Sequence, residues 1–277
     1  MDKQLLLLLL SVVLLFAVSA AEDADWSIDE YVILPDGGGE IPISIDTDQD
    51  DAPSSAPETA AIDNPARQDF IERIIAMGKD LYDRAGGKPQ RAHYAGDTYV
   101  CKNFTTYLFR KNRDDFCMAE FPGIQLVIPD NLPAAQCKPY YYGFLWKDVP
   151  VEKGNPFYVA EQFIYDTDLS YEENLALATE MMKHVQRGDF FQMSADYSAG
   201  TGAHSAIIIV PYDEENNLIH WMDSNMRGTR RNGIRYGYVQ FDAQAEPEWW
   251  AEAFCHKKRG ATIYRLRDDI AYVSDLN

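Results

Sequence analysis

Cys101 and His204 are the residues whose types and positions best fit nucleophilic catalysis in this chain. The run CKNFTTYLFRKN that begins at Cys101 has the apolar spacing of a helix, which places the thiol at or near a helix start. The unpaired amides and the macrodipole of a helix start favour a thiolate, the reactive form of cysteine. A nearby base would take the proton, and the expected chemistry is acyl transfer. On position alone, the alternative role for Cys101 is that of a small buried hydrophobe.

The base is expected to be His204, one of the 5 histidines of the chain. It follows the small residues GTGA and opens the apolar run SAIIIV, so its ring is expected at the mouth of a sheet. Histidine is the side chain whose ordinary pKa suits proton exchange near neutral pH. The alternative is an exposed histidine at a strand start with no chemical role.

An orienting group for the histidine is predicted from the next strand-like run. The segments AHSAIIIVPY and NLIHWMDSN flank DEENN and predict an antiparallel hairpin, whose register sets His204 beside Asn225 with Asp223 diagonal on the same face. A carboxylate or amide on the second ring nitrogen would hold the tautomer and support the imidazolium. His220 has the opposite parity along the strand and shares this role only if a bulge intervenes.

The elements that must position these residues predict an α+β protein. Helical spacing runs from Arg67 to Arg84, and Ser170 with Glu173 forms a capping box before a second helical run that ends at Gly188. Five strand-like runs follow, with one helical interruption at EPEWWAEAFCHKK: FFQMS, AHSAIIIVP, NLIHWMDSN, YGYVQF and ATIYRLR. We expect N-terminal helices packed on an antiparallel sheet.

Four pieces of the sequence occur in an order that points to a known superfamily: YAGDTYVCKNFTTYLF, RGDFFQM, GAHSAIII and LIHWMDSN. They are similar to the helix-capping cysteine, the Gly-Asp entry to the first strand, the His-headed strand and the strand that ends in an acid, one residue and Asn. The chain therefore resembles the papain-like cysteine peptidases and amidases of the bacterial cell wall, of the NlpC and CHAP types. Order and spacing agree over residues 94–225.

The resemblance implies a papain-like fold, with Cys101 as the nucleophile, His204 as the general base, Asp223 as the favoured orienting residue and Asn225 as a second polar partner. It implies a bacterial thiol hydrolase that cleaves amide bonds, most readily peptide or N-acyl links of peptidoglycan. No cofactor is implied. The chain has no CxxC or HExxH pattern, so no metal is expected either.

The sequence also departs from that superfamily. Val100 and Lys102 flank the cysteine where the NlpC type usually has Asp and Ser, and that type often has a histidine as its third residue, which would be His220. The stretch from Pro122 to Pro156, expected to form long ordered loops, has no counterpart. The substrate is therefore less defined than the mechanism. The alternative function is a papain-like binding or adhesion module at the bacterial cell surface that lacks catalysis.

The N-terminal residues predict export. Residues 1–20 have one lysine, an apolar block and small residues, which is typical of a signal peptide cleaved after Ala20 or Ala21; an uncleaved anchor is the alternative. Residues 21–66 are expected to be a disordered acidic linker or a removable pro-segment, and residues 67–277 the catalytic domain. We therefore expect a secreted, periplasmic or cell-surface protein.

Composition excludes several other classes. With 46% hydrophobic residues over 277 positions, the chain can bury a full core. Its net charge of -19 argues against nucleic acid or an anionic membrane as a partner. The 4 cysteines are too few for a disulfide scaffold, although Cys117 and Cys137 are equally compatible with a disulfide and with two thiols. Oligomeric state is not fixed by the sequence.

Overall fold

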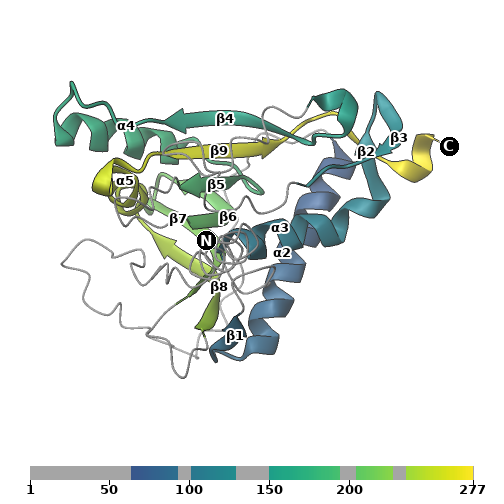
Figure 1. Ribbon diagram of the computed structural model, residues 1–277, viewed down its shortest axis with the longest axis horizontal. Coiled ribbons are helices and arrows are strands. Elements are labelled where there is room, and N and C mark those ends of the chain that lie inside the picture. Colours follow the sequence, from purple (N-terminus) through teal and green to yellow (C-terminus); the bar gives the residue numbers. More distant parts are fainter. Residues whose placement is uncertain (1–63, 93–100, 129–149, 194–203, 227–234, 277) are drawn as a thin grey trace, which may run out of the picture.

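A computed structural model of the protein describes residues 64–92, 101–128, 150–193, 204–226 and 235–276 (Figure 1). The predicted signal peptide and almost all of the predicted acidic linker lie outside these ranges. None of the helices in the described ranges is long and apolar enough to cross a membrane. Helices and antiparallel sheets are combined, which confirms the predicted α+β class.

The main sheet has seven strands in the order β1-β8-β7-β6-β5-β9-β4, and neighbouring strands in it are antiparallel. Its strands are β1 (Gln90–Ala92), β4 (Phe157–Phe163), β5 (Phe190–Met193), β6 (His204–Asp213), β7 (Leu218–Met226), β8 (Arg235–Ala245) and β9 (Ala261–Leu266). All five predicted strands belong to this sheet. The predicted hairpin is formed by β6 and β7.

A small three-stranded sheet, ordered β10-β2-β3, lies beside the main one (Figure 1). It contains β2 (Phe116–Met118), β3 (Phe121–Gln125) and β10 (Ile270–Tyr272). Short 3-10 turns complete the chain: η1 (Arg113–Asp115), η4 (Val151–Lys153), η6 (His256–Lys258) and η7 (Val273–Leu276). The predicted loop stretch 122–156 therefore contains most of β3 and all of η4, and its residues 129–149 lie outside the described ranges.

Helices cover both faces of the main sheet (Figure 1). They are α2 (Pro65–Ala85), α3 (Cys101–Asn112), α4 (Tyr171–Lys183) and α5 (Pro247–Cys255). Helices α2 and α3 share one apolar cluster with the sheet, which includes Phe70, Phe104 and Ile207. Helices α4 and α5 share a second cluster, which includes Ala206, Met182 and Trp250. Burial of these two clusters, which lie on opposite faces because neighbouring strand residues point opposite ways, fixes the helices on the sheet.

The ends of the helices follow local sequence signals. Ser170 accepts a hydrogen bond from the Glu173 amide, and the Glu173 carboxylate accepts one from the Ser170 amide, so the predicted capping box is present. Asn64 caps α2, with proline as the first helical residue. Helix α2 thus begins before Arg67, and residues 64–66, assigned above to the acidic linker, belong to the folded domain.

The turn into β5 depends on a glycine and a buried ion pair. Gly188 has a φ of +86°, and a Cβ there would lie 2.6 Å from a side-chain carbon of Ile71 in α2, so a larger residue would have to displace that side chain. The next residue, Asp189, is buried and accepts two hydrogen bonds of 2.8 Å from Arg265 of β9. The Gly-Asp entry to the strand is therefore a turn held between a helix and a neighbouring strand.

Candidate active site

His204 and Asp223 form a buried pair at the point where β6 begins. Nε2 of His204 lies 2.8 Å from Oδ2 of Asp223, and the two side chains are 2% and 5% exposed. Ala206 pairs with Asp223 across β6 and β7, which is the register predicted from the hairpin and places Asp223 diagonal to His204. The predicted orienting contact between these two residues is therefore present.

Cys101 interacts with the same imidazole from the first residue of α3. Burial of the ring is the largest single influence on the pKa of His204 and lowers it. The interactions with Asp223 and Cys101 outweigh burial and raise the pKa to about 9. Asp223 takes Nε2, and the buried Nδ1 has no hydrogen-bond partner among the described residues, so Nδ1 is the ring nitrogen left to exchange a proton with the thiol.

A buried hydrogen bond holds α3 against β6 close to this site. Oγ1 of Thr105 lies 3.0 Å from Oγ of Ser205, and both residues are fully buried. Thr105 is one helical turn after Cys101 and also donates a 3.4 Å hydrogen bond to the Cys101 carbonyl, while Ser205 adjoins His204 in sequence. The link therefore sets the position of the helix start relative to the strand start.

Trp250 of α5 stacks on the other side of the histidine. The ring centroids of His204 and Trp250 are 5.8 Å apart with an interplanar angle of 15°. Trp250 in turn contacts Trp221 and Trp249 within the second apolar cluster. The site thus lies at the end of the sheet, with α3 contributing the thiol from one face and α5 an aromatic wall from the other. The stacked indole is part of the surroundings that bury the His204 ring.

Among the described residues, Asn225 forms no hydrogen bond with His204. Asn225 lies in β7 opposite Tyr238 of β8 and is half-buried. Within the described ranges, Asp223 is the β7 residue that contacts the imidazole. The predicted role of Asn225 as a second polar partner is not supported by a hydrogen bond to the imidazole. Asp223 forms such a bond and is the better supported orienting residue.

His220 takes part in a different histidine–carboxylate pair. Its Nδ1 lies 2.7 Å from Oδ1 of Asp242 in β8, and the two side chains are 23% and 59% exposed. This hydrogen bond is the largest cause that lowers the pKa of Asp242. The register between β6 and β7 shifts at two places near His220, and the described hydrogen bond of its ring goes to Asp242. His220, the alternative third residue, therefore lies apart from the site.

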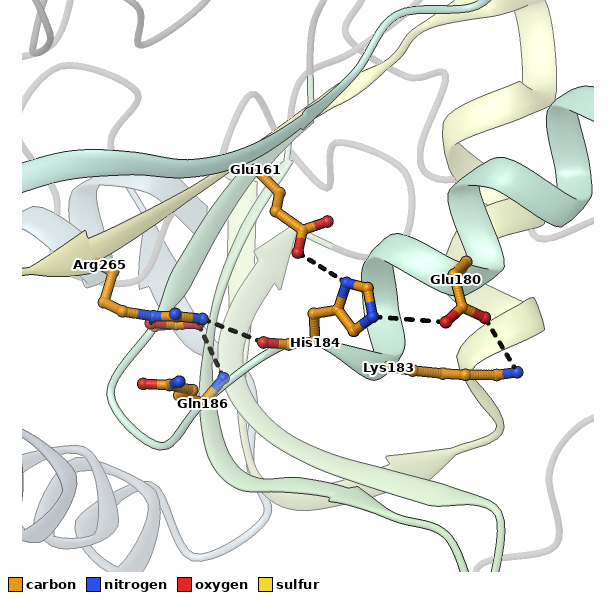
Figure 2. A network of polar contacts seen from close by, with 7 residues as sticks. Glu161, Glu180, Lys183, His184, Gln186 and Arg265 are labelled. Carbon is orange, nitrogen blue, oxygen red and sulfur yellow. Dashed lines mark hydrogen bonds and ion pairs between the residues drawn. The ribbon is translucent and has the colours of Figure 1, made fainter. Parts of the chain in front are cut away.

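His184 lies in a third polar network, at the end of α4 (Figure 2). Its Nδ1 is 2.7 Å from Glu161 of β4 and its Nε2 is 3.3 Å from Glu180, while Lys183 also reaches Glu180. Both ring nitrogens thus face carboxylates, and 52% of the side chain is exposed. This arrangement fixes the end of α4 to the edge strand and offers no thiol to the imidazole.

The other described cysteines are poor candidates for the nucleophile. Cys117 and Cys255 are buried thiols, and Cys101 is half-buried. Burial raises the pKa of Cys117, and burial together with Glu252 raises the pKa of Cys255 to about 11. Cys117 is therefore a thiol in the structure, and Cys137, its proposed partner, lies outside the described ranges. Among the described residues, no group of three or more His, Cys, Asp or Glu side chains could hold a metal ion.

Sequence reasoning missed Trp250, Thr105 and Ser205 as supports of the site. The run EPEWWAEAF signalled a helix with a heavy apolar face, but not the strand residue that this face would meet. Thr105 lies four residues after Cys101, a spacing that places both on one helix face and that offered the only signal for the link.

The comparisons with family models, with curated proteins and with solved structures return no match for this chain.

Proposed function

We propose that the protein is a thiol hydrolase that cleaves amide bonds by acyl transfer. The observation that carries this proposal is the buried imidazole of His204, bonded to Asp223 through one nitrogen and in contact with the thiol of Cys101. Each of the three residues comes from a different element, and a helix start, a strand start and a neighbouring strand converge on one ring. This convergence is what a nucleophile, a base and an orienting carboxylate require.

In the proposed reaction, the Cys101 thiol gives its proton to His204 and its sulfur attacks the carbonyl carbon of the substrate. The C–N bond then breaks while His204 protonates the departing amine, which leaves a thioester. Water adds to the thioester, the C–S bond breaks, and a carboxylic acid and the thiol are released. Asp223 holds the ring and stabilises its protonated form throughout.

The papain-like architecture of the NlpC and CHAP types belongs to the same proposal. A cysteine at a helix start, a histidine heading an antiparallel strand and an acid on the next strand agree with it. Peptide or N-acyl links of peptidoglycan are then the favoured substrates, and an exported bacterial protein is the expected setting. The chain needs no cofactor for this chemistry.

The direct test is replacement of Cys101 by alanine. We expect hydrolysis of peptidoglycan fragments to be abolished and the melting temperature to stay within a few degrees, because a half-buried thiol contributes little to packing. Cys101→Ser is the matched variant, which keeps a hydroxyl in place of the thiol. Hydrolysis by Cys101→Ala at the wild-type rate would refute the proposal.

The complete burial of His204, which is 1% exposed, favours a second candidate, a binding module without catalysis. Iodoacetamide separates the two candidates. A reactive thiol beside a base is alkylated at Cys101 near pH 7 much faster than a cysteine in an unfolded peptide. Labelling no faster than in the peptide would support the binding module.

A further inference from the structure

A row of polar side chains crosses the main sheet beside the candidate active site. Gln192 of β5 pairs with Ser205 of β6 on one side and with Thr262 of β9 on the other. Thr262 pairs in turn with Gln162 of β4. Thr105 of α3 meets the row at Ser205. We call these five side chains the polar row.

The polar row ends the apolar core on the face that α2 and α3 cover. Two residues away in each strand, the same face carries Phe190, Ile207 and Tyr264, all fully buried in the first apolar cluster. Packing alone would favour apolar residues in the next row as well. A polar row in such a position calls for hydrogen-bond partners.

Such partners are present at both ends of the row but not at its centre. Thr105 and Ser205 bond to each other at one end, and the Gln162 amide donates a 3.2 Å hydrogen bond to Thr262 at the other. Gln192, between them, is 1% exposed, and neither its Oε1 nor its Nε2 has a hydrogen-bond partner among the described residues. A buried amide left in this state destabilises the fold, and an apolar side chain of equal size would not.

The row starts one helical turn from the nucleophile. Thr105 bonds both to Ser205 and to the carbonyl of Cys101, so the Ser205 end of the row lies beside the start of α3. Gln162, at the far end, lies on the exposed edge strand β4. Gln192 therefore lies between the end of the row beside Cys101 and the exposed end at Gln162.

We propose that the polar row is a substrate subsite in which Gln192 binds an amide of the chain joined to the scissile bond. This proposal rests on the proposed thiol hydrolase function. A glutamine side chain donates through Nε2 and accepts through Oε1, so one peptide-like amide satisfies both of its unpartnered atoms. The subsite thus selects peptide-like substrates over apolar acyl chains.

Two alkylating reagents of similar length test the subsite. Both reagents share the amide next to the reactive carbon; beyond it, iodoacetyl-glycyl-glycinamide carries two further amides and N-hexyl iodoacetamide carries only a hydrocarbon chain. We expect the wild-type protein to favour the first reagent at Cys101, and Gln192→Met to lower the ratio of the two second-order rate constants about tenfold, as expected for loss of one buried hydrogen bond. Gln90→Met, in the opposite edge strand β1, is the matched control and keeps the wild-type ratio.

The outcomes separate the subsite from the proposed function. Rapid alkylation of Cys101 with a ratio that Gln192→Met leaves unchanged would overturn the subsite and leave the hydrolase proposal standing. No selective alkylation of Cys101 in the wild-type protein would overturn both. The melting temperature of Gln192→Met should equal or exceed that of the wild type, since an unpaired amide is removed. If Gln192→Met unfolds, an unchanged ratio in Gln162→Ala, at the exposed end, would also overturn the subsite.

Discussion

Two histidine–aspartate pairs lie on neighbouring strands of one sheet and differ in almost everything except their length. His204–Asp223 and His220–Asp242 have separations of 2.8 Å and 2.7 Å. The first pair is buried, stacks on Trp250 and meets a thiol, whereas the second lies at the surface. A hydrogen bond between histidine and aspartate does not by itself define a candidate catalytic pair. Burial and the neighbouring groups determine whether the histidine could exchange a proton with a nucleophile.

Replacement of each histidine by glutamine should give the largest difference in hydrolysis rate between the two pairs. His204→Gln keeps a donor for Asp223 but removes the base, so we expect the rate of amide hydrolysis to fall roughly a thousandfold. His220→Gln, the matched variant of the exposed pair, should stay within about twofold of the wild-type rate. Steady-state kinetics on one substrate measures both. Similar losses in the two variants would show that the two pairs are equivalent.

Replacement of each aspartate by asparagine should give the next largest difference. Asp223→Asn keeps a polar group near Nε2 but removes the charge that supports the imidazolium, so hydrolysis should fall about a hundredfold. Asp242→Asn should leave the rate nearly unchanged. Asn225→Ala belongs in the same series and should cost less than about threefold. A larger loss in Asn225→Ala than in Asp223→Asn would make Asn225 the orienting residue.

The free energy of unfolding should depend on pH because of the buried pair. The pKa of His204 is raised from 6.5 to about 9 in the folded state, so between these values the folded protein holds a proton that the unfolded chain has released. The stability that this proton contributes is complete below pH 6.5 and is lost as the pH rises toward 9. The free energy of unfolding of the wild type, measured by urea denaturation, should therefore fall toward that of His204→Gln over this window. Parallel curves for the two proteins would contradict the raised pKa.

The smallest expected effect concerns the link between α3 and β6, which the exposed pair lacks. Thr105→Val and Ser205→Ala should each lower the free energy of unfolding by about 1 kcal/mol, and the double variant by less than their sum. Each should also slow hydrolysis a few-fold, because Cys101 is held less closely to His204. Thr106→Val, which removes a bond to the Asn103 carbonyl within the helix, is the control. Strict additivity in the double variant would show that the two hydroxyls do not interact.

Short-range sequence patterns predicted those features of the site that depend on neighbouring residues in the chain. The hairpin register follows from the alternation of β6 and β7 and correctly placed Asp223 diagonal to His204. The parity argument also separated His220 from the site. The capping box and the helix that begins at Cys101 were predicted from the spacing of a few residues.

The remaining features depend on contacts between distant segments. The sequence makes no prediction for strand β4: its burial does not alternate along the strand, and its register shifts between Val159 and Glu161. The small sheet has strands of three to five residues, too short for a period to be visible. The stack of Trp250 on His204 and the unpartnered amide of Gln192 arise only once the helices and strands are packed together.

The cap of α2 affects how the acidic N-terminal stretch can be studied. Asn64 holds the first turn of the helix through Oδ1, and its Nδ2 donates to the carbonyls of Asp268 and Ile270, near the other end of the chain. A protein shortened to begin at residue 67 would lose these hydrogen bonds of Asn64 together with the acidic stretch. Any change in its activity would then combine the loss of the acidic stretch with a loosened start of α2. A protein that begins at residue 64 would lack the acidic stretch and keep the hydrogen bonds of Asn64.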